Sequence, residues 1–127
     1  MKVRMYQVLD FETIYNKIKD IKMPIKTTYN FAKLAREINE EKLFYQQELQ
    51  RIIDNFGERD ENGNFVLTED KSGVQIKKEN LNECQKEIIA LSNLEVEIKG
   101  INLNIDELEN VELTLPEMEI LMAFIEE

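Results

Sequence analysis

The side chains that most often carry out chemistry in enzymes are scarce in this chain of 127 residues. It contains no histidine, which is the commonest general base and metal ligand, and a single cysteine, Cys84. Without a histidine base or a second thiol, Cys84 is expected to be a buried structural residue on an apolar helix face. The carboxylates Glu37, Glu40 and Glu41 lie on a predicted helix and are typical of a solvated surface. We therefore expect no enzymatic activity and no cofactor.

The segment Asp60-Glu61-Asn62-Gly63-Asn64 is the nearest approach to a metal-binding loop. A calcium-binding EF-hand loop needs glycine at its sixth position and a bidentate glutamate at its twelfth. Counted from Asp60, Gly63 stands at position 4 and Lys71 at position 12. We therefore expect no bound metal, and Asn62-Gly63 instead predicts a tight turn.

The charge of the chain is strongly acidic overall and unevenly distributed. The net charge of −10 argues against direct nucleic-acid binding, which needs a basic surface. Residues 1–36 nevertheless contain eight basic and three acidic side chains, a balance of +5, so the rest of the chain carries −15. Such asymmetry indicates either opposite fields that match within or between subunits, or two unrelated solvated faces.

Two charged sets are candidate binding surfaces. The basic set lies near the N-terminus and comprises Lys17, Lys19, Lys22 and Lys26. It would face phosphate groups if an oligomer sequestered a small phosphorylated ligand between its subunits. The acidic set lies in the C-terminal part and comprises Glu107, Glu109, Glu112, Glu117 and Glu119. It would either imitate the phosphates of nucleic acid and so inhibit a host defence system, or serve solubility and match the basic N-terminal third, which we favour.

The elements that position these residues are organised around one long helix, predicted over about 24–56. It begins at Pro24 or with Thr27 as N-cap, and Gly57 follows it where a left-handed cap is favoured. Its apolar residues recur at helical spacing on one face: Phe31, Leu34, Ile38, Tyr45, Leu49, Ile52 and Phe56.

The remaining segments predict short elements around this helix. Residues 1–9 alternate like a strand, and a short helix capped by Asp10 runs from Phe11 to Ile21. A turn and hairpin occupy 57–77, pairing 65–67 with 74–76, and a second, antiparallel helix covers about 78–92. Strands and a C-terminal helix occupy 93–127: strands at 94–98, 101–105 and 111–113, a helical turn at 106–109, and a last helix running to the chain end.

The last helix has the clearest start signal in the sequence. Thr114 and Glu117 form a capping box, with Pro116 in the first turn. Together these elements predict an α+β fold in a single domain over 1–127. In this fold one long central helix pairs with a shorter antiparallel helix, beside a small antiparallel sheet or hairpins and short N-terminal and C-terminal helices.

The long helix also predicts self-association. A helix of about 30 residues is about 45 Å long, whereas a compact chain of this size is about 35 Å across, so the helix would overhang its own globule. Its apolar surface is widest in the middle, at Leu43, Phe44 and Tyr45. We expect these residues to contact a second copy, most simply in a dimer, unless their own chain covers them.

Several segments follow one another in a recognisable order. They are Met23-Pro24-Ile25-Lys26, then Tyr29 and Ala32-Lys33-Leu34, the Gly57 to Asn64 turn, Leu94-Glu95-Val96-Glu97-Ile98, and a capped terminal helix closing with Phe124-Ile125-Glu126. In this order the chain resembles a family of small uncharacterised proteins of tailed phages and prophages of Gram-positive bacteria. One departure is Thr114-Leu115-Pro116, where a direct Ser/Thr-Pro is more usual.

The resemblance implies a phage origin and an α+β fold, with no assigned activity. We therefore expect a non-enzymatic, phage-encoded interaction protein that is homo-oligomeric and binds a host or phage protein. No apolar run is long enough to cross a membrane and the N-terminus is too polar for a secretory signal, so we expect it in the host bacterial cytosol. Incorporation into the virion is left open.

Overall fold

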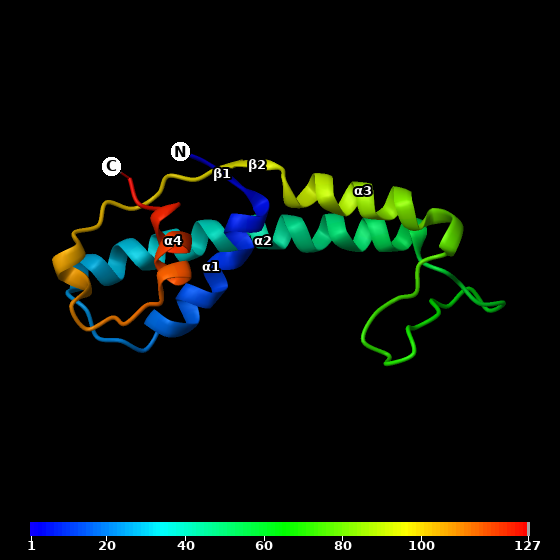
Figure 1. Ribbon diagram of the computed structural model, residues 1–127, viewed down its shortest axis with the longest axis horizontal. Coiled ribbons are helices and arrows are strands. Elements are labelled where there is room, and N and C mark those ends of the chain that lie inside the picture. The colour runs from blue at the N-terminus through cyan, green and yellow to red at the C-terminus, as the bar shows by residue number, and fades with distance from the viewer. Residues whose placement is uncertain (127) are drawn as a thin grey trace. The chain divides into compact units, whose positions relative to one another are not determined.

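The computed structural model describes residues 1–126 and has the α+β, helix-dominated fold expected from the sequence (Figure 1). Two 3-10 helices, η1 (Lys78–Asn80) and η2 (Ile105–Leu108), accompany the regular elements. These elements are, in chain order, β1 (Lys2–Arg4), α1 (Met5–Ile18), α2 (Ile25–Phe56), α3 (Leu81–Ser92), β2 (Glu95–Glu97) and α4 (Leu115–Met122).

The chain groups into two compact units. The first comprises residues 1–43 and the chain from Leu94 onward, and the second comprises Phe44–Asn93. Helix α2 supplies its first part to one unit and its second part to the other. The expectation of a single domain stays a prediction.

In the first unit, the N-terminal strand is shorter than predicted. It covers only Lys2–Arg4, and α1 begins at Met5 rather than after Asp10. The alternation of the first nine residues competes with a helical repeat, because Met5, Val8 and Phe11 are three apart and all buried. The helix places these three side chains in one core, which a strand would not do, since its faces alternate.

The first unit is held together by contacts between the two ends of the chain. Strand β1 pairs antiparallel with β2, with Val3 opposite Val96, and both side chains are buried. Helix α1 packs against α4, where the Phe11 and Phe124 rings meet edge to face with centroids 5.4 Å apart. From α2 the core receives Phe31, Leu34 and Ile38.

Helix α2 begins at Ile25, directly after Pro24, so Thr27 is not its N-cap. Thr27 lies inside the first turn with its side chain fully buried. Its hydroxyl donates a hydrogen bond of 2.6 Å to the Glu107 carboxylate, beside η2. Thr27 does not cap the helix because it already lies inside the helix, whereas an N-cap residue stands before the first helical residue.

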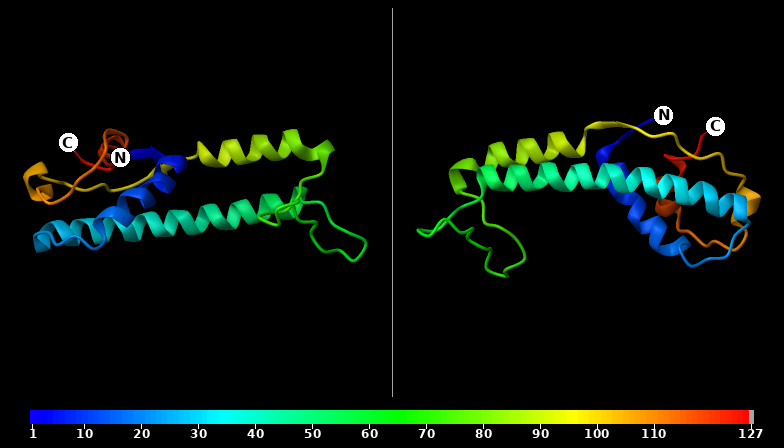
Figure 2. Two further views of the ribbon diagram at one scale, coloured as in Figure 1. Left: turned by 60° about the horizontal axis from the view of Figure 1, so that its bottom comes forward. Right: turned by 180° about the vertical axis from the view of Figure 1, so that it is seen from behind.

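In the second unit, α3 runs antiparallel beside the second part of α2, as expected (Figures 1 and 2). Ile52 of α2 and Cys84 of α3 are each 2% exposed. Gly57 ends α2 without the left-handed backbone that we predicted, since the positive φ angles among glycines belong to Gly63 and Gly100. It instead forms an isolated antiparallel bridge to Ile76.

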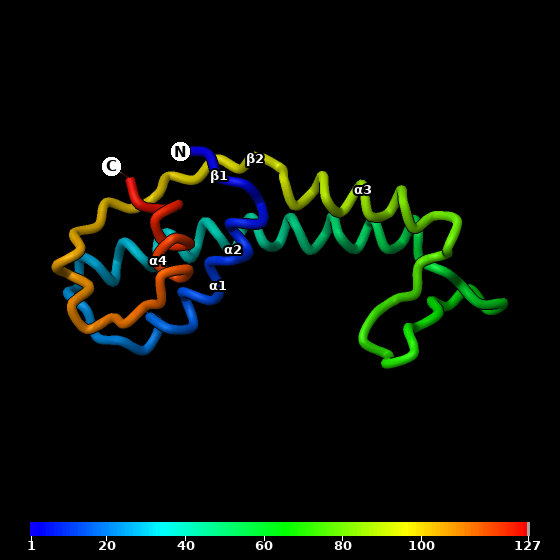
Figure 3. The backbone as a smooth tube through the Cα atoms, in the orientation of Figure 1, coloured from blue at the N-terminus to red at the C-terminus, as the bar shows by residue number. Residues whose placement is uncertain are grey.

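The segment between α2 and α3 is an irregular excursion that Figure 3 traces as a tube. Of the predicted hairpin, a single antiparallel bridge between Leu67 and Val74 is present. A separate antiparallel bridge pairs Arg59 with Phe65. The tight turn lies where Asn62-Gly63 places it, with Gly63 at φ +80°. The bridges are single pairs, so no regular strand is formed within 57–77.

The C-terminal part is less regular than predicted. Only Ile101 of the expected second strand makes a bridge, to Ile125, and residues 111–113 form no strand. The helical turn is present as η2, and α4 starts at the predicted capping box. Helix α4 ends at Met122, because Ala123 caps it and the chain then bridges Ile101.

Candidate functional site

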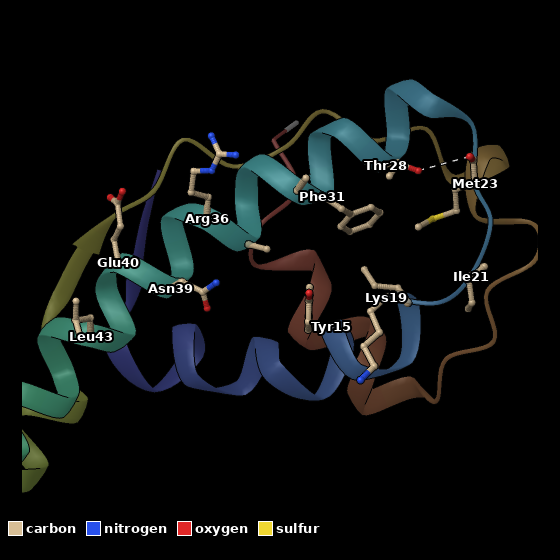
Figure 4. Close-up of a pocket in the computed structure, with 13 residues that line it drawn as sticks. Tyr15, Lys19, Ile21, Met23, Thr28, Phe31, Arg36, Asn39, Glu40 and Leu43 are labelled. Carbon is tan, nitrogen blue, oxygen red and sulfur yellow. Dashed lines mark hydrogen bonds between the residues drawn. The ribbon is translucent and has the colours of Figure 1, made fainter.

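The first unit has an apolar groove between α1 and the first part of α2 (Figure 4). It encloses about 640 Å³. We call it the α1–α2 groove, and it is lined by Tyr15, Ile18, Lys19, Ile21, Met23, Thr28, Phe31, Ala32, Ala35, Arg36, Asn39, Glu40 and Leu43. Figure 4 shows the Phe31 ring and the Met23 side chain pointing into it from opposite sides. A groove of this size with mainly apolar walls is typical of a binding surface.

The local sequence explains why a groove forms here. Helix α1 ends at Ile18, and the connection to Ile25 turns the chain away before α2 begins. On α2, Phe31, Ala35 and Asn39 are four apart and therefore share the face toward α1. Ala32 and Ala35 have no side-chain volume beyond Cβ, so the helices leave space between them where larger residues would have filled it.

A smaller hollow of about 250 Å³ extends the groove along the same two helices. It shares Tyr15, Ala35 and Asn39 with the α1–α2 groove. At this end the Lys42 ammonium of α2 lies 3.3 Å from the Glu12 carboxylate of α1. This ion pair joins the two helices across the groove floor and is part of the wall of the smaller hollow.

Charged groups border the groove on both sides. Lys19 directly follows α1, whereas Arg36 and Glu40 come from α2, and Figure 4 shows the charged ends of these side chains directed away from the space between the two helices. Within residues 1–126, no ion pair neutralises Lys19 or Arg36. The two cations are therefore available to an acidic group that approaches the groove from outside.

The predicted self-association residues are not covered by their own chain. Leu43 is 55% exposed and Phe44 is 42% exposed, while Tyr45 is half-buried. Leu43 is also a lining residue of the α1–α2 groove. We predicted self-association unless the chain itself covers Leu43, Phe44 and Tyr45, and it does not cover them fully.

The candidate basic set does not converge on one ligand site. The Lys17 ammonium lies 2.7 Å from the Glu117 carboxylate and is occupied there. Lys19 borders the α1–α2 groove, whereas Lys22 and Lys26 are exposed on the α1–α2 connection and the first turn of α2. The four lysines of the basic set therefore lie in different environments, although they are close together in the sequence.

The candidate acidic set is divided in the same way. Glu117 is only 7% exposed, and its pKa is lowered to about 2 by hydrogen bonds from Lys17 and then from Thr114. Glu107 accepts from the buried Thr27 hydroxyl. The remaining members, Glu109, Glu112 and Glu119, are exposed.

The single thiol, that of Cys84, is buried on α3. Burial raises the pKa of the Cys84 thiol, so the thiolate is disfavoured. Among residues 1–126, no three histidine, cysteine, aspartate or glutamate side chains gather in a way that would hold a metal ion. Over the same residues, no helix has the length and apolar character needed to cross a membrane.

Sequence reasoning missed the α1–α2 groove as a site. The signal available was the pair Ala32 and Ala35 beside Phe31 on an otherwise bulky apolar face. A small residue on such a face indicates either close helix packing or a hollow, and only the separation of the helices decides which.

No family model matches this chain, and no curated protein or solved structure matches it either.

Proposed function

We propose that this chain is a phage-encoded, non-enzymatic interaction protein of the host bacterial cytosol that self-associates and binds a protein partner. The observation that carries the proposal is the open, largely apolar α1–α2 groove. Phage origin rests on the sequence resemblance alone. The groove supports the proposal, because its size and mainly apolar walls are those of a typical binding surface.

Leu43 connects the groove to the predicted self-association surface. It lines the groove and still exposes more than half of its side chain. A partner that covers Leu43 would also cover its groove neighbours Asn39 and Ala35, which lie four and eight residues earlier on the same helix. Burying such a surface supplies the free energy that holds two chains together.

The experiment is a mass measurement by light scattering across micromolar concentrations. We expect the wild-type chain to exceed the mass of one copy, and Leu43→Asp to shift it toward one copy. Leu67→Asp is the matched control, because Leu67 is 51% exposed but lies in the segment between α2 and α3. A wild-type chain that stays a single copy would contradict the self-association.

Partner binding is tested separately. Wild-type protein and Leu43→Asp are each used to capture proteins from a lysate of the host, and the captured proteins are compared by mass spectrometry. We expect one or a few proteins that wild type retains and Leu43→Asp loses. Capture that is indifferent to Leu43→Asp would show that the partner site lies elsewhere than the groove.

The two alternative functions have less support from the side-chain arrangement. An acidic mimic of nucleic acid would use Glu109, Glu112 and Glu119, since Glu117 and Glu107 are engaged by other parts of the chain. Sequestration of a phosphorylated ligand by the basic set would proceed without Lys17, which Glu117 occupies. In each alternative, fewer charged side chains are therefore available to bind a ligand or partner than the sequence suggests.

A further inference from the structure

We propose that the α1–α2 groove of one copy receives the exposed face of α4 from a second copy. We define this α4 face by Leu115, Glu119 and Met122, which are separated by four and three residues and so share one side of the helix. The inference rests on the self-association proposed above and names the two surfaces that would meet.

The α4 face presents two large apolar side chains to solvent. Leu115 is 78% exposed and Met122 is 59% exposed, at the two ends of the helix. The opposite side of α4 is occupied, since Leu121 is fully buried and Glu117 is paired with Lys17 of α1. An amphipathic helix that presents anchors at this spacing is the usual occupant of an apolar groove.

Charge complementarity favours this occupant. The groove is bordered by Lys19 and Arg36, and the α4 face carries Glu119, with Glu112 just before the helix. None of these four groups makes an ion pair within residues 1–126. Among the described residues that line the groove, Glu40 is the one acidic group, and it reduces the attraction without reversing it.

In this proposal the α4 face comes from another copy. Groove and α4 face belong to the same compact unit, yet both are exposed, so they do not cover each other within one chain. Each copy therefore offers one groove and one α4 face. A two-fold dimer satisfies two such contacts at once, which is the simplest closed arrangement.

The first test reverses charge on each surface. We expect Lys19→Glu with Arg36→Glu, or Glu112→Lys with Glu119→Lys, each to weaken self-association at least tenfold in light scattering. Mixing the two double variants should restore assembly, because the reversed charges again attract. Lys26→Glu and Glu109→Lys are controls that each reverse one charge of the same sign at an exposed position outside both surfaces, and we expect them to assemble as the wild type does.

A second test does not depend on charge. Ala32→Cys in the groove and Met122→Cys on the α4 face are made in separate chains, mixed and oxidised, and we expect a disulfide between the two chains. Ile89→Cys, exposed on α3, replaces Met122→Cys as the control and should give none. Cys84 remains in all chains because it is buried.

The outcomes separate this inference from the proposed function. If the wild type assembles but the charge reversals leave its mass unchanged and no disulfide forms, the named surfaces are wrong and self-association stands. If the wild type is a single copy at every concentration, both are wrong. Rescue by mixing together with the expected disulfide establishes the contact.

Discussion

Lys17 of α1 and Glu117 of α4 are separated by 100 residues in the sequence, and their charged groups lie 2.7 Å apart. The same Glu117 oxygen accepts a hydrogen bond of 2.8 Å from the Thr114 backbone N–H. The Glu117 carboxylate therefore takes part in capping the N-terminus of α4 and also links that helix to α1. The pair also links one member of the basic set to one member of the acidic set.

The first prediction concerns the pH dependence of stability that this carboxylate confers. The pKa of Glu117 falls from an ordinary 4.5 to about 2 in the folded chain, chiefly through its hydrogen bond with Lys17. A lowered folded pKa means that the stabilisation is complete above about pH 4.5 and is lost as the pH falls toward 2. We expect Glu117→Gln to lower the melting temperature at pH 7.

The measurement is the difference in melting temperature between wild type and Glu117→Gln at several values of pH. Other carboxylates titrate in both proteins, so the difference isolates Glu117. We expect it to be constant from pH 7 to 5 and to shrink toward zero near pH 2. Glu109→Gln, at an exposed position outside the proposed contact surfaces, is the control and should show little difference at any pH. A difference that did not change with pH would contradict the prediction.

The second prediction concerns the close packing around Gly57. A Cβ atom at this position would lie 2.7 Å from the Ile53 carbonyl oxygen and 2.8 Å from the Phe65 ring. The backbone oxygen cannot move without disturbing the end of α2, so the added methyl group forces a local rearrangement. We expect Gly57→Ala to lower the free energy of unfolding by about 1–3 kcal/mol, measured by urea denaturation.

Gly73 provides a matched control for this substitution. It lies in the same segment between α2 and α3, and no atom would lie within 4 Å of an added Cβ. Its backbone φ is not positive, so alanine fits without strain. We expect Gly73→Ala to leave stability unchanged or to raise it slightly by restricting the unfolded chain. Equal effects of the two substitutions would show that crowding at Gly57 is not the cause.

The elements that the sequence predicts well are those with strong local signals. Helix α2 has an uninterrupted apolar stripe ending at Phe56, and α4 has the capping box at Thr114. The predicted start of α1 was wrong because Met5 and Val8 fit both the alternating pattern of a strand and the spacing of a helix. Burial in a core that α1 forms with α4, near the other end of the chain, decided between them, and no local pattern contains that information.

The charged sets illustrate the same limit at the level of the site. Sequence composition identifies a basic N-terminal third and an acidic C-terminal part, and their expected match occurs at Lys17 and Glu117. The sequence composition does not indicate which basic side chain pairs with which acidic one. Lys19 stays free at the α1–α2 groove while its near neighbour Lys17 is occupied, because residues two apart on a helix face different directions. The groove itself depends on the separation of two helices.

The third prediction tests the capping box of α4. The Thr114 hydroxyl accepts a hydrogen bond from the Glu117 backbone N–H at 3.4 Å. The Glu117 carboxylate in turn accepts a hydrogen bond from the Thr114 backbone N–H. Thr114→Ala removes the first bond and keeps the second. We expect the free energy of unfolding to fall by about 1 kcal/mol in urea denaturation.

Serine and a second threonine provide the comparison. Thr114→Ser keeps the hydroxyl and should retain wild-type stability, since serine is at least as good an N-cap. Thr13→Ala, at an exposed position inside α1, should be neutral or slightly stabilising, because alanine has the higher helix propensity. If Thr114→Ala were as stable as Thr114→Ser, the 3.4 Å bond would contribute nothing. The start of α4 would then depend on Glu117 and on the packing of Leu121 and Phe124 in the core.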